Sequence, residues 1–117
     1  MSVVWDVELE PEVEKWLSGL DIAGFAAAAF HLDRLAGQGP ALRMPHSRAL
    51  GEGLFELRFY LNRTAERITY FFPGEQRIVL LTEFHKQKMN ERTEIERARG
   101  AMARCIREGH TAEEDDQ

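Results

Sequence analysis

The stretch from residue 50 to residue 88 constrains the fold most, because it contains three strand-like runs separated by turn residues. In the first run, residues 54–61, Phe55, Leu57, Phe59 and Leu61 alternate with mostly polar residues, which is the period of a strand with one buried face. The second run, residues 66–72, repeats this alternation. The third run, Arg77 to Phe84, carries a continuous apolar block that is typical of a strand covered on both faces.

The alternation also predicts how the strands pair, because a slip of one residue would move every apolar side chain to the wrong face. Turns are expected at Asn62–Ala65 and at Pro73-Gly74. The predicted pairs are Leu61 with Glu66, Phe59 with Ile68, Leu57 with Tyr70, Phe55 with Phe72, Tyr60 with Arg67, Arg58 with Thr69, Phe72 with Arg77 and Arg67 with Thr82. This register places Arg58 and Arg67 one diagonal step apart on the face opposite the core, with Lys86 continuing on that face.

Two interpretations of this cationic cluster compete. In the first, Arg58, Arg67 and Lys86 are solvated side chains paired with Glu56, Glu66 or Glu83. In the second, neighbouring guanidinium groups on a rigid sheet form an anion site, most simply for phosphate, because they suit bidentate contacts to oxygen. Spacing alone does not decide between them.

The chain resembles a known family at several connected motifs. The resemblance covers residues 44 to 99 and includes the joined elements G-L-x-E-L-R and R-x-x-Y-F-F. The matching segments are Met44–Arg48, Leu50–Arg58, Arg67–Phe72, Ile78–Leu81 with Phe84, Lys86 and Lys88, and Glu94–Ala98. Together they look like the phage Gp-type and HigB-like toxins of the RelE/ParE superfamily.

This resemblance implies the toxin of a type II toxin-antitoxin pair, usually an endoribonuclease that cuts mRNA on the ribosome without a metal or other cofactor. Its expected partners are mRNA, the ribosome and a cognate antitoxin of the helix-turn-helix type. Such an antitoxin should cover the cationic face with an acidic or helical segment, or bind elsewhere and block entry to the ribosome.

RNA cleavage needs a proton acceptor for the 2′-hydroxyl, cations that stabilise the transition state and a proton donor for the leaving oxygen. Arg58, Arg67 and Lys86 are the predicted catalytic cations. Further phosphate contacts are expected from Arg43, Arg48, Lys88 and Arg92. For the general base, His85 and His46 are both open, and an ordinary packing role for His46 is the competing interpretation.

Two alternative functions stay open. One is a non-hydrolytic ParE-like toxin that binds DNA gyrase, and the other is a regulatory binding module without toxicity. The fold does not choose between these functions.

Charge is distributed unevenly along the chain. The net charge is -5, but residues 43–107 hold thirteen basic and eight acidic residues, about +5. The sheet and last helix are therefore the part expected to meet a polyanion. The remaining acidic charge lies in residues 1–42 and in the tail, 108–117, which lacks apolar residues and is predicted to be disordered.

The other segments complete an α+β fold of the RelE-like type, predicted as one domain over residues 1–107. A strand is expected at Val3–Leu9, a helix from Pro11 to Gly19, a second helix at Ile22–Ala36 capped by Asp21, and irregular chain at Ala41–Ala49. Asn90 begins the last helix, which reaches about Arg107, with Thr93 and Glu96 as a competing capping box. The predicted buried stripes are Phe25, Ala28, Ala29, Leu32 and Leu35 in the second helix, and Ile95, Ala98, Met102, Cys105 and Ile106 in the last.

Composition argues against a membrane protein, an internal disulfide and a metal site. With 44% hydrophobic and 30% charged residues and no long apolar run, the chain is expected to be cytoplasmic and not membrane-bound. A single cysteine, Cys105, rules out an internal disulfide and is expected to be a core residue. No Cys or His pair has metal-ligand spacing, so no metal site is predicted.

Overall fold

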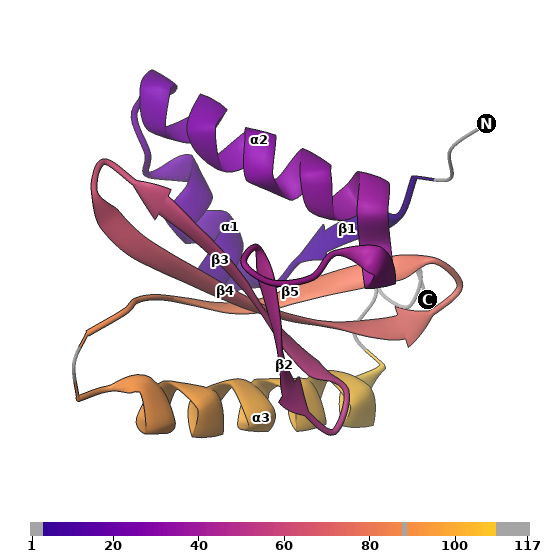
Figure 1. The fold of residues 1–117 in the computed structure, drawn as a ribbon. Helices are drawn as coiled ribbons and strands as arrows, with labels where there is room; N and C mark the ends of the chain where they lie inside the picture. The colour runs from indigo at the N-terminus through magenta and orange to yellow at the C-terminus, as the bar shows by residue number, and fades with distance from the viewer. Residues whose placement is uncertain (1–3, 88, 110–117) are drawn as a thin grey trace.

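A computed structural model describes residues 4–87 and 89–109 of the chain. Its five-stranded sheet has the order β1-β5-β4-β3-β2, with α1 and α2 on one face and α3 on the other (Figure 1). The elements are β1 (Asp6–Leu9), α1 (Pro11–Ser18), α2 (Ile22–Gln38), the short 3₁₀ helix η1 (Gly39–Ala41), β2 (Ser47–Gly51), β3 (Leu54–Leu61), β4 (Thr64–Gly74), β5 (Arg77–His85) and α3 (Glu91–Glu108).

The first strand and the two following helices form as predicted, with small changes at their ends. The strand β1 begins at Asp6, three residues after the predicted start at Val3, which lies outside the described residues, and it pairs in parallel with β5. Pro11 occupies the first turn of α1, where its missing N–H leaves no bond unmade. Asp21 caps α2 by accepting a hydrogen bond of 2.7 Å from the Gly24 amide.

Two tight turns connect the central strands, and both differ from the prediction. Asn62 and Arg63 form the β3–β4 turn with φ angles of 50° and 69°, and Glu75 and Gln76 form the β4–β5 turn with φ angles of 55° and 60°. Two consecutive residues with positive φ match the right-handed twist of a hairpin. The turn predicted at Pro73-Gly74 is wrong, because β4 continues through Gly74.

These turns shift the register of β3 and β4 by two residues from the prediction. Phe55 pairs with Tyr70, Leu57 with Ile68, Phe59 with Glu66, and Arg58 directly with Arg67. A shift of two keeps every side chain on its predicted face, since strand side chains alternate with period two. The predicted β4–β5 pairs are also wrong: Gly74 pairs with Arg77 and Arg67 with Phe84, because two irregularities interrupt this ladder.

One strand, β2, was not predicted from the sequence. The chain at 47–51, assigned in part to an irregular segment, forms β2 and pairs with Leu54–Leu57 of β3 in antiparallel fashion. Its residues are mostly small or polar, so they carry little apolar alternation. Because β2 begins at Ser47, opposite Leu57, the part of β3 beyond Leu57 has no strand beside it on this edge.

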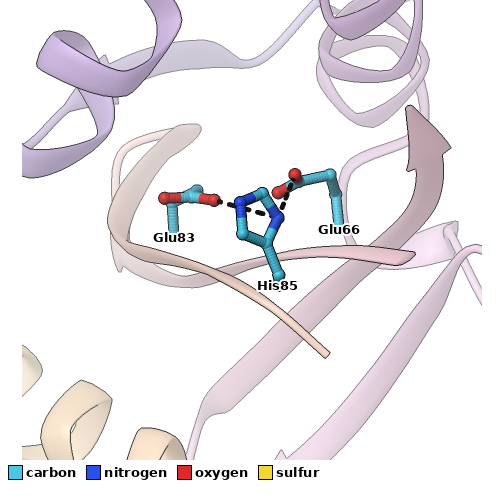
Figure 2. A group of neighbouring side chains, drawn as sticks. All are labelled: Glu66, Glu83 and His85. Carbon is cyan, nitrogen blue, oxygen red and sulfur yellow. Dashed lines mark ion pairs between the residues drawn. The ribbon is translucent and has the colours of Figure 1, made fainter. Parts of the chain in front are cut away.

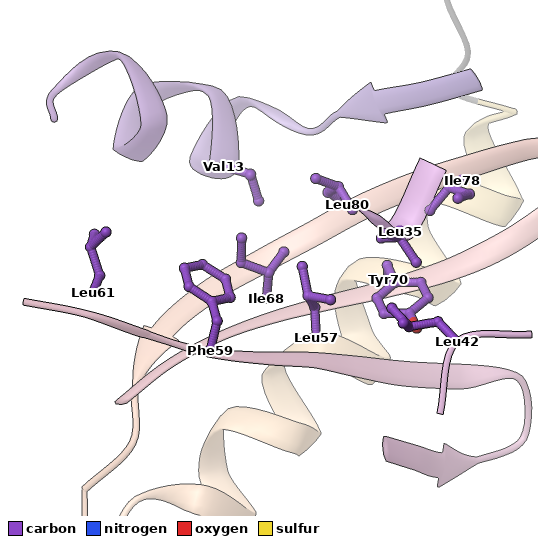
Figure 3. Close-up of a cluster of buried hydrophobic side chains, with 10 residues drawn as sticks. All are labelled: Val13, Leu35, Leu42, Leu57, Phe59, Leu61, Ile68, Tyr70, Ile78 and Leu80. Atoms are coloured by element: carbon purple, nitrogen blue, oxygen red, sulfur yellow. The ribbon is translucent and has the colours of Figure 1, made fainter. Parts of the chain in front are cut away.

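Two apolar cores hold the helices against the sheet. Under α1 and α2, a cluster gathers around Leu57, Ile68 and Leu80 (Figure 3). Within it, the hydroxyl of the buried Tyr70 bonds to the hydroxyl of Ser47, as required for a buried polar group. Under α3, the second cluster contains Leu54, Phe71, Val79, Leu81, Ala98, Ala101 and Cys105.

Helix α3 ends one residue after the predicted Arg107, and Gly109 adopts the left-handed conformation behind it. Asn90 holds the cap position, although its side chain bonds to the preceding loop instead of the helix. The predicted burial of Cys105 is confirmed. Ile106 and Phe25 are exposed, contrary to prediction, because each helix contacts the sheet over a narrower stripe than its apolar residues cover.

Residues 110–117 of the predicted disordered tail lie outside the described residues. Within the described ranges, no helix combines the length and apolar character needed to cross a bilayer.

Gly39 is the residue at which the chain leaves α2, and its conformation and close contacts can be tested by substitution. Its φ is +52°, and an added Cβ would lie 2.4 Å from Nε1 of Trp5, whereas Gly37 has open space around it. We expect Gly39→Ala to lower the free energy of unfolding by about 2 kcal/mol or more, through strain and overpacking. Gly37→Ala should leave it unchanged or raise it by about 0.5 kcal/mol. Urea unfolding of both variants measures this, and equal stabilities would contradict it.

Candidate functional site

Arg58 and Arg67 face each other on neighbouring strands β3 and β4. Their side chains are 21% and 7% exposed, so both guanidinium groups are largely removed from water. The interpretation of Arg67 as a solvated surface residue is therefore wrong. Its Nη1 donates to the Glu66 carbonyl at 3.0 Å, which fixes one end of the guanidinium.

Glu56 supplies the counter-charge between the two arginines. It is fully buried, and its Oε1 lies 3.9 Å from Nε of Arg58 and 3.7 Å from Nε of Arg67. Neither carboxylate oxygen has a hydrogen-bond partner among the described residues. Burial raises the pKa of Glu56, and Arg67, followed by Arg48, opposes this rise. The carboxylate thus holds the arginines through charge alone, at distances that leave their N–H groups able to turn towards another anion.

The same arrangement affects the arginines. Burial lowers the pKa of Arg67, and the neighbouring charge of Arg58 lowers it further, while Glu56 acts in the opposite direction. Two like charges brought this close in a dry environment favour any anion that can contact both.

An open pocket of about 480 Å³ lies beside these arginines at the free edge of β3. Its lining consists of His31, Pro45, His46, Arg58, Phe59, Tyr60 and Arg67. The segment before β2 forms one wall, held by the hydrogen bond of 2.8 Å from the Arg58 amide to the His46 carbonyl. A pocket that combines two arginines, two histidines and an exposed aromatic ring suits a nucleotide or another phosphorylated ligand.

Tyr60 is the functional candidate that sequence reasoning did not select. It is 72% exposed and shares the strand face of Arg58. Its phenol is one of the groups that raise the pKa of Arg67, against the lowering by burial. An exposed tyrosine beside a cationic pair can stack on a base or exchange a proton with a bound ligand. The signal was available in the alternation of β3, which places Tyr60 two residues after Arg58.

His46 lies in the pocket with one ring nitrogen occupied. Its Nδ1 is hydrogen-bonded to Nη1 of Arg34. Arginine only donates hydrogen bonds, so Nδ1 must accept this one and the neutral ring carries its proton on Nε2. In this arrangement His46 can donate a hydrogen bond from Nε2, and it would have to leave Arg34 to take up a proton at Nδ1.

His85, the other candidate base, is not part of this pocket. It pairs with Glu66, which lies opposite Phe59 on the face beneath α1 and α2, whereas Arg58 and Arg67 face the other way. Its Nδ1 lies 2.5 Å from Oε1 of Glu66 and 4.0 Å from Oε2 of Glu83 (Figure 2). Burial, together with the neighbouring Glu66, raises the pKa of Glu83 to about 8.

The remaining predicted residues that the structure describes do not line this pocket. Lys86 is exposed directly after β5, and Arg43 is exposed before β2. Arg48 forms an ion pair of 3.0 Å with Glu91, and Arg92 is 94% exposed beside Glu96. Arg48 and Arg92 both border a second open depression at the start of α3. Lys88 lies outside the described residues.

Comparison with known proteins identifies the family of the chain. A family model described as phage-derived protein Gp49-like matches residues 15–105, which is most of the 117 residues. The chain therefore belongs to the phage-derived Gp49-like family. No curated protein sequence matches it.

Two solved structures share the fold. A free-state mutant of the E. coli toxin RelE is 12% identical with a TM-score of 0.59, and the alignment covers 86% of this chain and 97% of that one. The toxin-antitoxin complex RelBE2 from Mycobacterium tuberculosis is 21% identical with a TM-score of 0.54, covering 72% and 100%. At these identities the likeness concerns the fold, and it confirms the predicted RelE-like α+β architecture.

Removal of the buried carboxylate tests this charge arrangement. We expect Glu56→Gln to lower the free energy of unfolding by about 3 kcal/mol, because it leaves Arg58 and Arg67 facing each other without a counter-charge. Inorganic phosphate should restore more stability to this variant than to the parent, since an anion can replace the carboxylate. The measurement is urea unfolding with and without phosphate at constant ionic strength.

The exposed turn residue Glu52 gives the matched control. Glu52→Gln should change the free energy of unfolding by no more than about 0.5 kcal/mol. Equal stabilisation of parent, Glu56→Gln and Glu52→Gln by phosphate would show a general salt effect and contradict the anion pocket.

Proposed function

We propose that this protein is the toxin of a type II toxin-antitoxin pair, of the HigB-like kind, and that it cleaves mRNA at the pocket beside β3. One observation carries this proposal: Arg58 and Arg67 lie directly opposite each other in a pocket that also presents Tyr60 and His46. The RelE-like fold and the Gp49-like family agree with it. The expected place of action is the cytoplasm, on mRNA bound to the ribosome.

The reaction is an attack of the 2′-hydroxyl oxygen on the adjacent phosphorus, followed by departure of the 5′-oxygen. Arg58 and Arg67 contact the non-bridging phosphate oxygens, and their low exposure strengthens the stabilisation of the negative transition state. Nε2–H of His46 donates a hydrogen bond to the leaving oxygen, which takes its proton from solvent. Tyr60 stacks on a base next to the cut or relays the 2′-hydroxyl proton, accepting it on the phenol oxygen and releasing its own O–H proton to solvent.

The outer cations orient the rest of the RNA. Arg48 and Arg92 border the depression at the start of α3, where a strand leaving the arginine pocket can continue. Arg43 and Lys86 are exposed around the pocket and add phosphate contacts that weaken with salt. These contacts position the substrate without selecting its sequence.

Arg58 gives the sharpest test of toxicity, because it is more exposed than Arg67 and its loss should disturb the fold less. We expect induced expression of the parent to arrest growth, and Arg58→Gln to relieve the arrest by removing one transition-state contact. Arg107→Gln, in the exposed last turn of α3, is the matched control and should stay toxic. Circular dichroism checks that both variants are folded.

Transcript mapping in the arrested cells separates the classes of activity. The proposal requires cuts within translated regions that disappear when initiation of translation is blocked. DNA breaks or altered supercoiling with intact transcripts would favour the gyrase-binding alternative. A folded parent without any effect on growth would favour a regulatory module.

We further propose that the antitoxin docks on α2. Ile22, Phe25 and Phe30 are 91%, 48% and 61% exposed, so one side of this helix presents an apolar surface to solvent. Exposed apolar patches of this kind mark protein interaction surfaces. This surface lies on the helix layer, so an antitoxin bound there acts by restricting access to the ribosome.

A double variant tests this docking surface. Ile22→Asp with Phe25→Asp should weaken binding of the antitoxin, taken as the product of the adjacent gene, by about 100-fold or more, because two charged groups would enter an apolar interface. Toxicity should persist, since the pocket is unchanged. Arg58→Gln serves as the comparison and should bind normally in titration calorimetry. Normal binding by the double variant with weakened binding by Arg58→Gln would show that the antitoxin covers the pocket instead.

A further inference from the structure

Three potential metal ligands converge on the sheet face opposite the arginine pocket. Glu66 on β4 pairs directly with His85 on β5, and Glu83 lies two residues before His85 on the same face. One ligand atom from each of the three residues lies within 4.8 Å of the others. Figure 2 shows the two carboxylates on either side of the imidazole ring.

Burial makes this group different from a surface cluster of acids. Glu66 is only 1% exposed, and its Oε2 has no hydrogen-bond partner among the described residues. The side chain of Glu83 is 13% exposed, and its Oε2 likewise has no hydrogen-bond partner among the described residues, the nearest cation being Nδ1 of His85 at 4.0 Å. Two carboxylates removed from water require a cation or a proton between them, because burying unpaired charge is costly.

We propose that Glu66, Glu83 and His85 form a binding site for a divalent transition metal, with Zn²⁺ as the best fit. Imidazole nitrogen together with carboxylate oxygens is a ligand set that Zn²⁺ accepts, with three protein ligands and a water completing four-coordination. Mg²⁺ and Ca²⁺ prefer oxygen ligands alone and in larger number.

The geometry needs one small adjustment. The contact of 2.5 Å between Nδ1 of His85 and Oε1 of Glu66 suits a shared proton, so the ring must withdraw by about 1 Å to admit a metal with bonds of about 2.0 to 2.2 Å. His85 can make this movement because its side chain is 53% exposed. The glutamates, by contrast, are held in place by the sheet and by burial.

The surroundings favour a fixed site. Oε2 of Glu12, on α1, accepts a hydrogen bond of 3.0 Å from the Glu83 amide, which anchors the backbone of this ligand. The nearby positive charge of Arg97 is already matched by Glu12 and Glu94. A bound metal would join the start of β4 to the end of β5, directly before the segment that leads to α3, so it should stabilise the fold without entering the arginine pocket.

The test uses the full-length protein after removal of metals with EDTA. Titration calorimetry with Zn²⁺ should show one ion bound per chain, and thermal unfolding should show a rise in Tm that Mg²⁺ does not produce. Glu83→Gln and His85→Gln should each weaken Zn²⁺ binding by at least about tenfold, which even the loss of an outer-shell partner commonly causes. Binding should also release protons, because the ligands must be deprotonated.

Two variants control for adventitious binding. Glu96→Gln changes an exposed carboxylate and His46→Gln changes the histidine of the arginine pocket, and both should bind Zn²⁺ like the parent. Because His85 is half exposed, His85→Gln should fold, which circular dichroism verifies. The proposal is overturned if the parent binds no Zn²⁺, or if the folded His85→Gln variant binds it as tightly as the parent. Neither readout depends on toxicity, so this result stands apart from the proposed ribonuclease activity.

Discussion

The two tight turns of the central hairpins determine which side chains meet across the sheet. Each turn holds two consecutive non-glycine residues at positive φ, a conformation that costs free energy and persists because the flanking strands impose it. The short β3–β4 turn sets Arg58 opposite Arg67, and the β4–β5 turn together with two irregularities sets Glu66 opposite His85. Both candidate sites thus depend on the lengths of these turns, because a shift of register would separate the members of each.

The first residues of β4 place charged side chains on both faces of the sheet. Glu66 and Arg67 are consecutive, so pleating sends one side chain beneath α1 and α2 and the other towards the arginine pocket. Both are nearly fully buried, and the Glu66 carbonyl accepts the hydrogen bond from Nη1 of Arg67. A movement of this backbone would therefore affect both groups. The sheet is rigid here because β4 has neighbours on both sides, which is the requirement for holding guanidinium groups in a fixed geometry.

The sequence predicts the faces of this sheet better than its register. Alternation assigned Tyr70 to the core and Arg58 to the opposite face, because burial of an apolar face enforces the parity of each strand. It could not determine the register, since a shift of two residues keeps that parity and only the turn conformation decides. The strand β2 escaped because its pairing with β3 depends on backbone hydrogen bonds more than on apolar residues. The burial of Arg67 and Glu56 could not be predicted for a related reason. Two charged residues that are buried against each other give the same alternating sequence pattern as two charged residues on a face exposed to solvent.

The acidic character of the chain limits how a polyanion can reach the proposed pocket. With a net charge of -5, long-range electrostatics do not steer RNA towards the molecule, so rapid capture of free RNA is disfavoured. The contacts that remain are short-range: two arginines largely removed from water, and an exposed tyrosine on which a base can stack. Such contacts act only once the substrate is already close. Under the proposed function, a surface that presents mRNA at high local concentration, as the ribosome does, would supply this condition.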